Sequence, residues 1–224
     1  MKGFVKENGL SLFFGAIFLA TLVGQALVGH SDYNHDQALH LSPTISLFRY
    51  VTSSAFGSAV MENWQSEYLQ FTLYILGTVW LLQRGSSESK EIDRAGGESD
   101  EQQKVGRHAR PDSPLWARVG GARTFVYSNS LLFVMLAIWL GSWFAQSLTS
   151  HTNFNAEQLS HHGPTVSWVQ YLGTSNFWQQ TLQNWQSEFL AVGSMAILSV
   201  YLRQRGSPES KAVGDPDTAT GGAD

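Results

Sequence analysis

The chain has 224 residues, of which 43% are hydrophobic and only 14% are charged. A soluble domain contains roughly 25% charged residues, and the charges here are concentrated outside the apolar segments. The net charge of −4 does not indicate a nucleic-acid partner, and the absence of cysteine excludes disulfides, iron–sulfur clusters and thiol catalysis.

The first apolar segment, Leu10–Gly29, contains 20 residues without a charge. A helix of this length spans about 30 Å, which matches the hydrocarbon thickness of a bilayer. The segment therefore predicts a membrane-spanning helix, with Asn8 as its N-cap. A cleaved signal peptide begins in the same way and is the alternative.

An outer region and a second span follow. The polar segment His30–Leu41 predicts a loop, and the next residues predict a short helix over Pro43–Thr52. Ser54 is expected to cap the following helix. That helix should begin near Ala55 and run for about 28 residues as a tilted span.

Residues 83–123 contain eight Lys or Arg and seven Asp or Glu, which predicts a disordered linker. The chain after the linker repeats the chain before it. At an offset of 121, residues 4–90 match residues 125–211 at 34 of 87 positions, including Asn63-Trp64-Gln65-Ser66-Glu67 and Asn184-Trp185-Gln186-Ser187-Glu188. The second copy predicts spans over Leu131–Leu148 and Ser175–Arg203, with a short helix over Pro164–Gly173. Because the counterpart of the first span is internal, the repeat argues against a signal peptide.

Lys and Arg are distributed asymmetrically. The N-terminal segment carries two, the linker eight and the C-terminal segment three, whereas the two histidine-bearing segments contain only Arg49. Because positive charge marks the cytoplasmic side, we expect an inner-membrane protein with both termini and the linker inside the cell. The histidine-bearing segments should face outward, and the two copies should share one orientation.

Polar residues that both copies share define the candidate site. A lipid-facing position needs only to be apolar, so shared polar residues indicate a specific partner. A carboxylate near the bilayer edge is costly unless it is paired or protonated, which draws attention to Glu67 and Glu188. The predicted cluster comprises His30, Asn34, His40, Asn63, Trp64 and Glu67 in one copy, and His151, Asn155, His161, Asn184, Trp185 and Glu188 in the other.

Three interpretations of this cluster are open. Two histidines and one carboxylate per copy are a usable set for a divalent metal, although no HExxH spacing supports it. A His–Glu pair also suits a response to pH. In the structural interpretation, the His and Asn side chains fix the loops and the Trp rings anchor at the headgroup level. The metal candidates are His30, His40, Glu67, His151, His161 and Glu188; no cofactor is indicated.

No nucleophile motif, Walker sequence or dinucleotide fingerprint occurs, so no catalytic residue is predicted and a non-enzymatic protein is expected. Gln83-Arg84-Gly85-Ser86 recurs as Gln204-Arg205-Gly206-Ser207 and is interpreted as a helix C-terminus with a glycine cap. The doubled pentapeptide, the aromatic residue after it (Tyr68, Phe189) and this exit motif resemble the DUF6766 family of uncharacterised bacterial membrane proteins. The resemblance implies a membrane location and adds no activity.

The sequence thus predicts an all-α integral membrane protein with four transmembrane helices from two tandem two-helix repeats, plus short interfacial helices outside. The predicted boundaries are a first repeat over 1–84, a cytoplasmic linker over 85–122, a second repeat over 123–205 and a disordered tail over 206–224. The expected role of the outer polar surface is loop packing, or binding of a protein partner, lipid headgroup or ion. The alternative is a small ion or solute transporter or channel that uses the Glu67/Glu188 pair. The lipid bilayer is the predicted partner.

Overall fold

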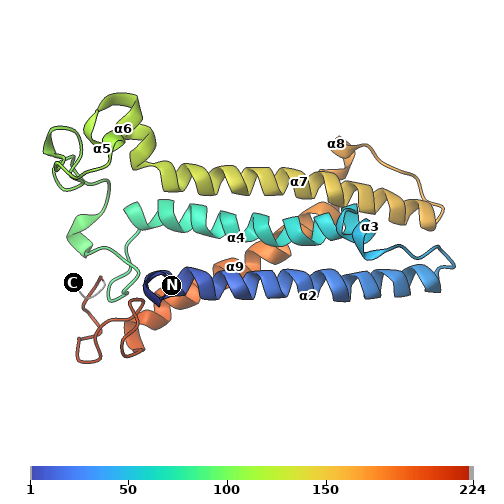
Figure 1. Ribbon diagram of the computed structural model, residues 1–224, viewed down its shortest axis with the longest axis horizontal. Helices are drawn as coiled ribbons and strands as arrows, with labels where there is room; N and C mark the ends of the chain where they lie inside the picture. Colours follow the sequence, from blue (N-terminus) through green and yellow to red (C-terminus); the bar gives the residue numbers. More distant parts are fainter. Residues whose placement is uncertain (1, 222–224) are drawn as a thin grey trace. The chain divides into compact units, whose positions relative to one another are not determined.

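The computed structural model describes residues 2–221, and every regular element in that range is helical (Figure 1). The predicted all-α class is therefore confirmed. The helices are α1 (Lys2–Glu7), α2 (Gly9–Leu39), α3 (Leu47–Val51), α4 (Ser54–Trp80), η1 (Ile92–Arg94), η2 (Gly106–His108), α5 (Leu115–Arg118), α6 (Gly121–Ser128), α7 (Ser130–Ser160), α8 (Trp168–Tyr171) and α9 (Ser175–Tyr201). Met1 and the end of the predicted tail, residues 222–224, lie outside the described range.

The chain divides into two compact units that each combine segments from both halves of the sequence. The first unit contains residues 1–61 and 145–171, and therefore α2, α3, the start of α4, the second half of α7, and α8. The second unit contains residues 62–144 and 172–224, including the rest of α4, the first half of α7, and α9. The domain boundaries expected from the repeat stay a prediction.

Helices α2 and α7 are much longer than the predicted spans, with 31 residues each. The polar segments 30–39 and 151–160 were expected to be loops, and this expectation is wrong. They continue the helices because neither contains a proline or glycine to break the hydrogen-bond ladder. At 1.5 Å per residue, each helix is about 46 Å long.

Both long helices end in the same way, at residues that the sequence did not single out. The backbone at Leu41 and His162 is left-handed, with φ of 54° and 57°. The Ser42 amide donates to the Gln37 carbonyl at 2.8 Å, and the Gly163 amide donates to the Gln158 carbonyl at 2.7 Å. This is the Schellman pattern, which normally places glycine at the left-handed position. Because Leu and His occupy it here, the helix ends were not recognisable.

The short helices after these turns are smaller than predicted. Residues 42–46 lie outside any helix, and α3 begins only after Ser46, whose hydroxyl accepts from the Arg49 amide at 3.3 Å. The predicted start at Pro43 is therefore wrong, and the same shortening applies to the helix predicted over Pro164–Gly173, where α8 starts at Trp168. Figure 1 shows that the chain folds back after α2 toward α3 and after α7 toward α8.

The long helices α4 and α9 agree with the predicted lengths, but several caps do not. The hydroxyl of Ser53, not Ser54, accepts from the first helical turn of α4, through the Phe56 amide at 3.4 Å. Asn8 makes no side-chain cap at the start of α2, and instead its side chain donates to the Phe4 carbonyl at 3.0 Å. Gly85 and Gly206 do have positive φ, at 85° and 82°, but they lie in turns beyond the helix ends at Trp80 and Tyr201.

Burial in this fold is reversed relative to a soluble protein. In the described part of the chain, 13 polar or charged side chains are buried against 7 hydrophobic ones. The 31 residues of α2 include no buried residue, although the helix is strongly apolar. By length and composition, α2 and α7 are the two described helices that could cross a membrane.

Within the first unit, the start of α4 packs on α7 through small and polar residues. The Ser58 and Ser150 hydroxyls are 2.5 Å apart, and Ser54 donates to the Asn153 side chain at 2.8 Å. A Cβ added at Gly57 would lie 3.1 Å from the Thr149 methyl group. Small residues allow such close helix approach, and hydrogen bonds between them hold helices together where lipid offers no hydrophobic drive.

Candidate functional site

Two of the predicted site residues form a clasp at the end of α2. His30 and Asn34 lie one helical turn apart on α2, so both side chains project from the same face. The Asn34 amide group pairs with the backbone of Ile45, donating to its carbonyl at 2.9 Å and accepting from its amide at 2.8 Å. The His30 Nε2 atom lies 2.7 Å from the same carbonyl. Since a carbonyl only accepts, this contact places the proton on Nε2.

The second copy reproduces this clasp atom for atom. Asn155 donates to the Val166 carbonyl at 2.9 Å and accepts from the Val166 amide at 2.9 Å. The His151 Nε2 atom lies 2.8 Å from that carbonyl. In both clasps, the asparagine bonds to the amide and the carbonyl of a residue that lies outside any helix. Buried backbone groups require such partners, which explains why both copies have histidine and asparagine at these positions. Sequence analysis predicted the residues but not their partner.

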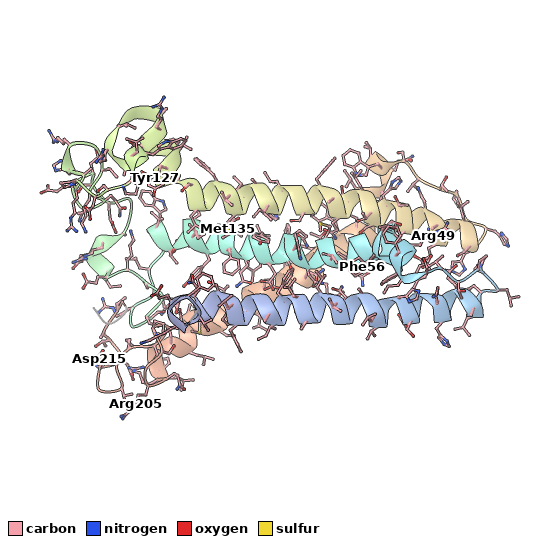
Figure 2. The ribbon with its side chains drawn as sticks, in the orientation of Figure 1. Arg49, Phe56, Tyr127, Met135, Arg205 and Asp215 are labelled. Carbon is pink, nitrogen blue, oxygen red and sulfur yellow. The ribbon has the colours of Figure 1, made fainter. Side chains whose placement is uncertain are left out.

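A tyrosine closes each clasp. Tyr50 and Tyr171 are 6% and 0% exposed, and their rings lie 5.9 and 5.7 Å from those of His30 and His151. In the first copy the Tyr50 ring also packs on Phe56, at 5.5 Å (Phe56 is labelled in Figure 2). The Tyr50 hydroxyl approaches Gly29 so closely that any Cβ there would collide with it. The identity of Tyr50 and Tyr171 at the repeat offset was the available signal for this role.

His40 and His161 lie outside the clasps, at the ends of α2 and α7. His40 is exposed and its Nδ1 contacts the Asp36 carbonyl at 2.9 Å. The His161 backbone amide donates to the Glu157 carbonyl at 3.1 Å, and its side chain is exposed. These positions fit helix termini rather than a ligand site. In residues 2–221, no group of three or more His, Asp or Glu side chains could hold a metal ion.

The two pentapeptides lie in the second unit, where they contact each other. The Trp185 indole donates to Gln65 Oε1 at 2.7 Å. The Ser66 hydroxyl lies near the Glu188 carboxylate, and Glu67 interacts with Glu188 electrostatically. The sequence predicts two arrangements for these carboxylates: one in which each joins the histidines of its own copy, and one in which Glu67 and Glu188 form a pair. The structure therefore places Glu67 and Glu188 within electrostatic range of each other.

The repeated residues in this contact have different environments. Gln65 and Ser66 are 0% and 2% exposed, whereas their counterparts Gln186 and Ser187 are exposed. In contrast, Trp185 and Glu188 are more buried than Trp64 and Glu67. The first copy thus buries Gln65 and Ser66, in the middle of its pentapeptide. The second copy instead partly buries Asn184, Trp185 and Glu188. The site is asymmetric although the sequences are identical.

An aromatic cluster lies beside this contact. Trp143 stacks on Trp139 at 5.8 Å between ring centroids, and it lies 5.9 Å from Trp185 and 6.3 Å from Phe177. Asn63 and Trp64, the remaining members of the predicted set, sit on the same turns of α4 as Gln65.

Several fully buried polar atoms near this cluster have no hydrogen-bond partner in the protein. Among the described residues of the second unit these include Gln65 Nε2, Thr181 Oγ1 and the indole nitrogen of Trp143. Buried polar atoms of this kind normally bond to a partner, because leaving one unpaired costs about 1–3 kcal/mol. The sequence does not predict Thr181 as a site residue. Its counterpart in the first copy is the apolar Val60, and only residues shared by both copies were selected.

The chain belongs to the DUF6766 family, described as a domain of unknown function, whose model matches residues 1–222. The match confirms the family that the pentapeptides and exit motifs resemble. No curated protein and no solved structure matches the chain.

Proposed function

We propose that this family member is a non-enzymatic, multi-pass protein of the inner membrane, with α2, α4, α7 and α9 as four spans derived from an internal duplication. The reversed burial supports this proposal. Exposed apolar side chains are favourable against lipid hydrocarbon, and polar side chains between helices satisfy each other there. The Lys/Arg distribution supports cytoplasmic termini and linker. In this arrangement the two clasps face outward and hold the outer segments.

The ion-binding centre in this proposal is the Glu67/Glu188 pair, and the electrostatic interaction between Glu67 and Glu188 is the observation that supports it. Two neighbouring carboxylates repel each other unless a proton or cation lies between them. Within residues 2–221, no Lys, Arg or His side chain forms an ion pair with either carboxylate. A proton or monovalent cation is therefore the proposed ligand, with the Ser66 hydroxyl as an additional oxygen.

Ion binding can be tested by thermal unfolding of the full chain in lipid nanodiscs. NaCl, KCl and choline chloride are compared at one ionic strength, each at acidic and neutral pH. Binding at 100 times Kd stabilises the folded state by about 2.7 kcal/mol, so Na⁺, K⁺ or acid should raise the Tm relative to choline at neutral pH. Glu188→Gln should abolish the rise, and Glu157→Gln, on an exposed turn of α7, should keep it. An equal rise in Glu188→Gln, or no rise in the native protein, contradicts the proposal.

Transport is the second candidate, because the pair is built from one residue of each copy. Proteoliposomes with an internal pH dye or a cation dye, under an imposed gradient, measure it directly. Flux that exceeds protein-free vesicles and disappears in Glu188→Gln identifies a transporter. Binding without flux leaves an ion-binding membrane protein.

A further inference from the structure

The repeated exit motif extends further than its four-residue core, and its loop is built identically in both copies. Gln83-Arg84-Gly85-Ser86-Ser87-Glu88-Ser89-Lys90 corresponds to Gln204-Arg205-Gly206-Ser207-Pro208-Glu209-Ser210-Lys211. In both loops the serine before the lysine accepts from the first amide, at 2.9 Å. In both, the amide of the glutamate donates to the first serine, at 3.1 and 3.2 Å. The two glutamates are thus presented in the same way.

These two loops meet within the second unit. The Ser87 hydroxyl donates to the Glu209 carbonyl at 2.8 Å, and the Ser86 and Ser199 hydroxyls are 2.8 Å apart. The Glu88 and Glu209 side chains hydrogen-bond with each other. The Tyr74 hydroxyl of α4 also donates to the Glu88 carboxylate. This contact with Glu88 raises the pKa of Glu209, which allows the protonated carboxyl of Glu209 to donate.

The cationic side chains near the exit loops bind groups other than Glu88 and Glu209. Lys90 pairs with Glu98 at 3.2 Å, and Arg203 pairs with Asp217 at 3.0 Å. Lys211 is 2% exposed and donates to the carbonyls of Asp217 and Ala219 at 2.9 and 3.0 Å. Within residues 2–221, no cationic side chain forms an ion pair with Glu88 or Glu209. Arg205 and Asp215, which lie on either side of Lys211 in the sequence, are labelled in Figure 2.

A cavity of about 320 Å³ opens beside Glu88, between α4, α9 and the first exit loop. Its wall is mostly apolar, with Leu73, Gly77, Leu81, Phe189 and Val192. Glu88 is the one charged residue of the lining, and Gln70 Oε1 is a buried acceptor there without a hydrogen-bond partner. The other polar groups of the lining are uncharged and come from Tyr74, Thr78, Gln83, Ser86 and Ser89. At about 30 Å³ per water molecule, the cavity has room for roughly ten waters or a ligand of similar volume.

We propose that this cavity binds an amphiphile with a protonated primary amine and an alkyl chain. The ammonium group would lie at Glu88, because it supplies the positive charge that the lining lacks. The alkyl chain would cover the apolar wall between α4 and α9. Glu67 and Glu188 do not line the cavity, so this site does not depend on the ion-binding proposal.

The test uses the full chain in phosphatidylcholine nanodiscs, with bound molecules counted by native mass spectrometry and Tm measured in parallel. Dodecylamine is compared with dodecanoate and dodecanol, which share its chain and lack its charge. Nanodiscs with part of the phosphatidylcholine replaced by phosphatidylethanolamine form a further arm. Retention of dodecylamine alone identifies a free amine as the ligand, and retention of phosphatidylethanolamine, with or without dodecylamine, identifies an aminolipid.

Two variants locate the site. Glu88→Gln removes the charge and keeps an acceptor for Tyr74, and we expect it to weaken amine retention about tenfold, equal to 1.4 kcal/mol. Gly77→Phe fills part of the cavity and keeps the Glu88 side chain, and should abolish retention. The space around the Gly77 Cβ is open except for a Leu81 methyl at 3.8 Å. Gly141→Phe on α7, with nothing within 4 Å, is the matched control and should retain the amine.

The proposal is overturned if no amine is retained, if dodecanoate or dodecanol is retained equally well, or if Gly77→Phe binds the amine like Gly141→Phe. Loss of amine binding with intact ion-dependent Tm shifts separates this site from the Glu67/Glu188 pair.

Discussion

At the scale of single residues, the two asparagines of the clasps have the most specific chemistry. A carboxamide can both accept from an amide and donate to a carbonyl, and Asn34 and Asn155 use both atoms on one backbone residue. An isosteric carboxylate keeps the acceptor and loses the donor. The amide, and not simply a polar group, is therefore what the repeat preserves.

We predict that Asn34→Asp and Asn155→Asp each destabilise the folded protein by about 1–3 kcal/mol, because a carboxylate oxygen would face the Ile45 or Val166 carbonyl. Thermal unfolding in nanodiscs measures the loss. His40→Gln, at an exposed position, is the control and should change little. A wild-type Tm in both Asp variants would show that the clasps do not stabilise the outer segments.

At the scale of elements, α3 approaches α2 most closely at Gly29. Gly29 gives the room that the Tyr50 hydroxyl occupies, so glycine here is a packing requirement and not a source of flexibility. Its counterpart Ser150 has a different task, since its hydroxyl bonds to Ser58. The two copies therefore use this position for two different contacts.

Gly29→Ala should destabilise the first unit by about 1–3 kcal/mol, because the added methyl group overpacks the contact. Removing the hydroxyl in Tyr50→Phe should relieve the clash, so the double variant should be more stable than Gly29→Ala alone. Gly24→Ala is the matched control on the same helix, with nothing within 4 Å, and should not destabilise. Additive losses in the double variant would contradict the contact.

The exit loops should depend on pH. The pKa of Glu209 is raised, chiefly by its hydrogen bond with Glu88. A raised pKa means that the folded state holds the proton more tightly, so this contribution is complete below the ordinary value of 4.5 and is lost as pH rises through the raised pKa. We predict falling hydrogen-exchange protection of residues 83–90 and 204–211 over that window.

Glu209→Gln should make this protection independent of pH across the same window. The opposite sign applies to Lys211, because burial lowers its pKa and rising pH favours its neutral form in the fold. A slope that persists unchanged in Glu209→Gln would therefore not come from the Glu88/Glu209 contact.

At the scale of the whole molecule, many large apolar side chains of the described residues are exposed, while several polar side chains are buried. Phe13, Phe14 and Leu19 on α2 are each about 60% exposed, while Gln65, Gln146 and Thr181 are 0% exposed. Water would penalise this arrangement and hydrocarbon would not. This burial pattern and the Lys/Arg distribution are the observations on which the proposed membrane topology rests.

The absence of cysteine makes a direct test of topology possible. We predict that Ser160→Cys, at the end of α7, reacts with an impermeant maleimide added to intact cells, whereas Ser99→Cys in the linker reacts only after permeabilisation. Labelling of Ser99→Cys from outside would reverse the orientation. Equal labelling of both sites in intact cells would contradict a membrane topology altogether.

The sequence alone determined the helical class, the extent of α4 and α9, the repeat, and the residues of both clasps. These properties follow from the lengths of the apolar segments and from identity at one offset, and both can be read without knowing any contact between distant residues. It did not determine that α2 and α7 continue through their polar ends, because Leu41 and His162 adopt a left-handed turn without glycine. Nor did it determine the partners of Asn34, Glu188 or Glu88. Those contacts join residues far apart in the chain, and identical pentapeptides acquire different neighbours only when tertiary packing buries opposite faces of α4 and α9.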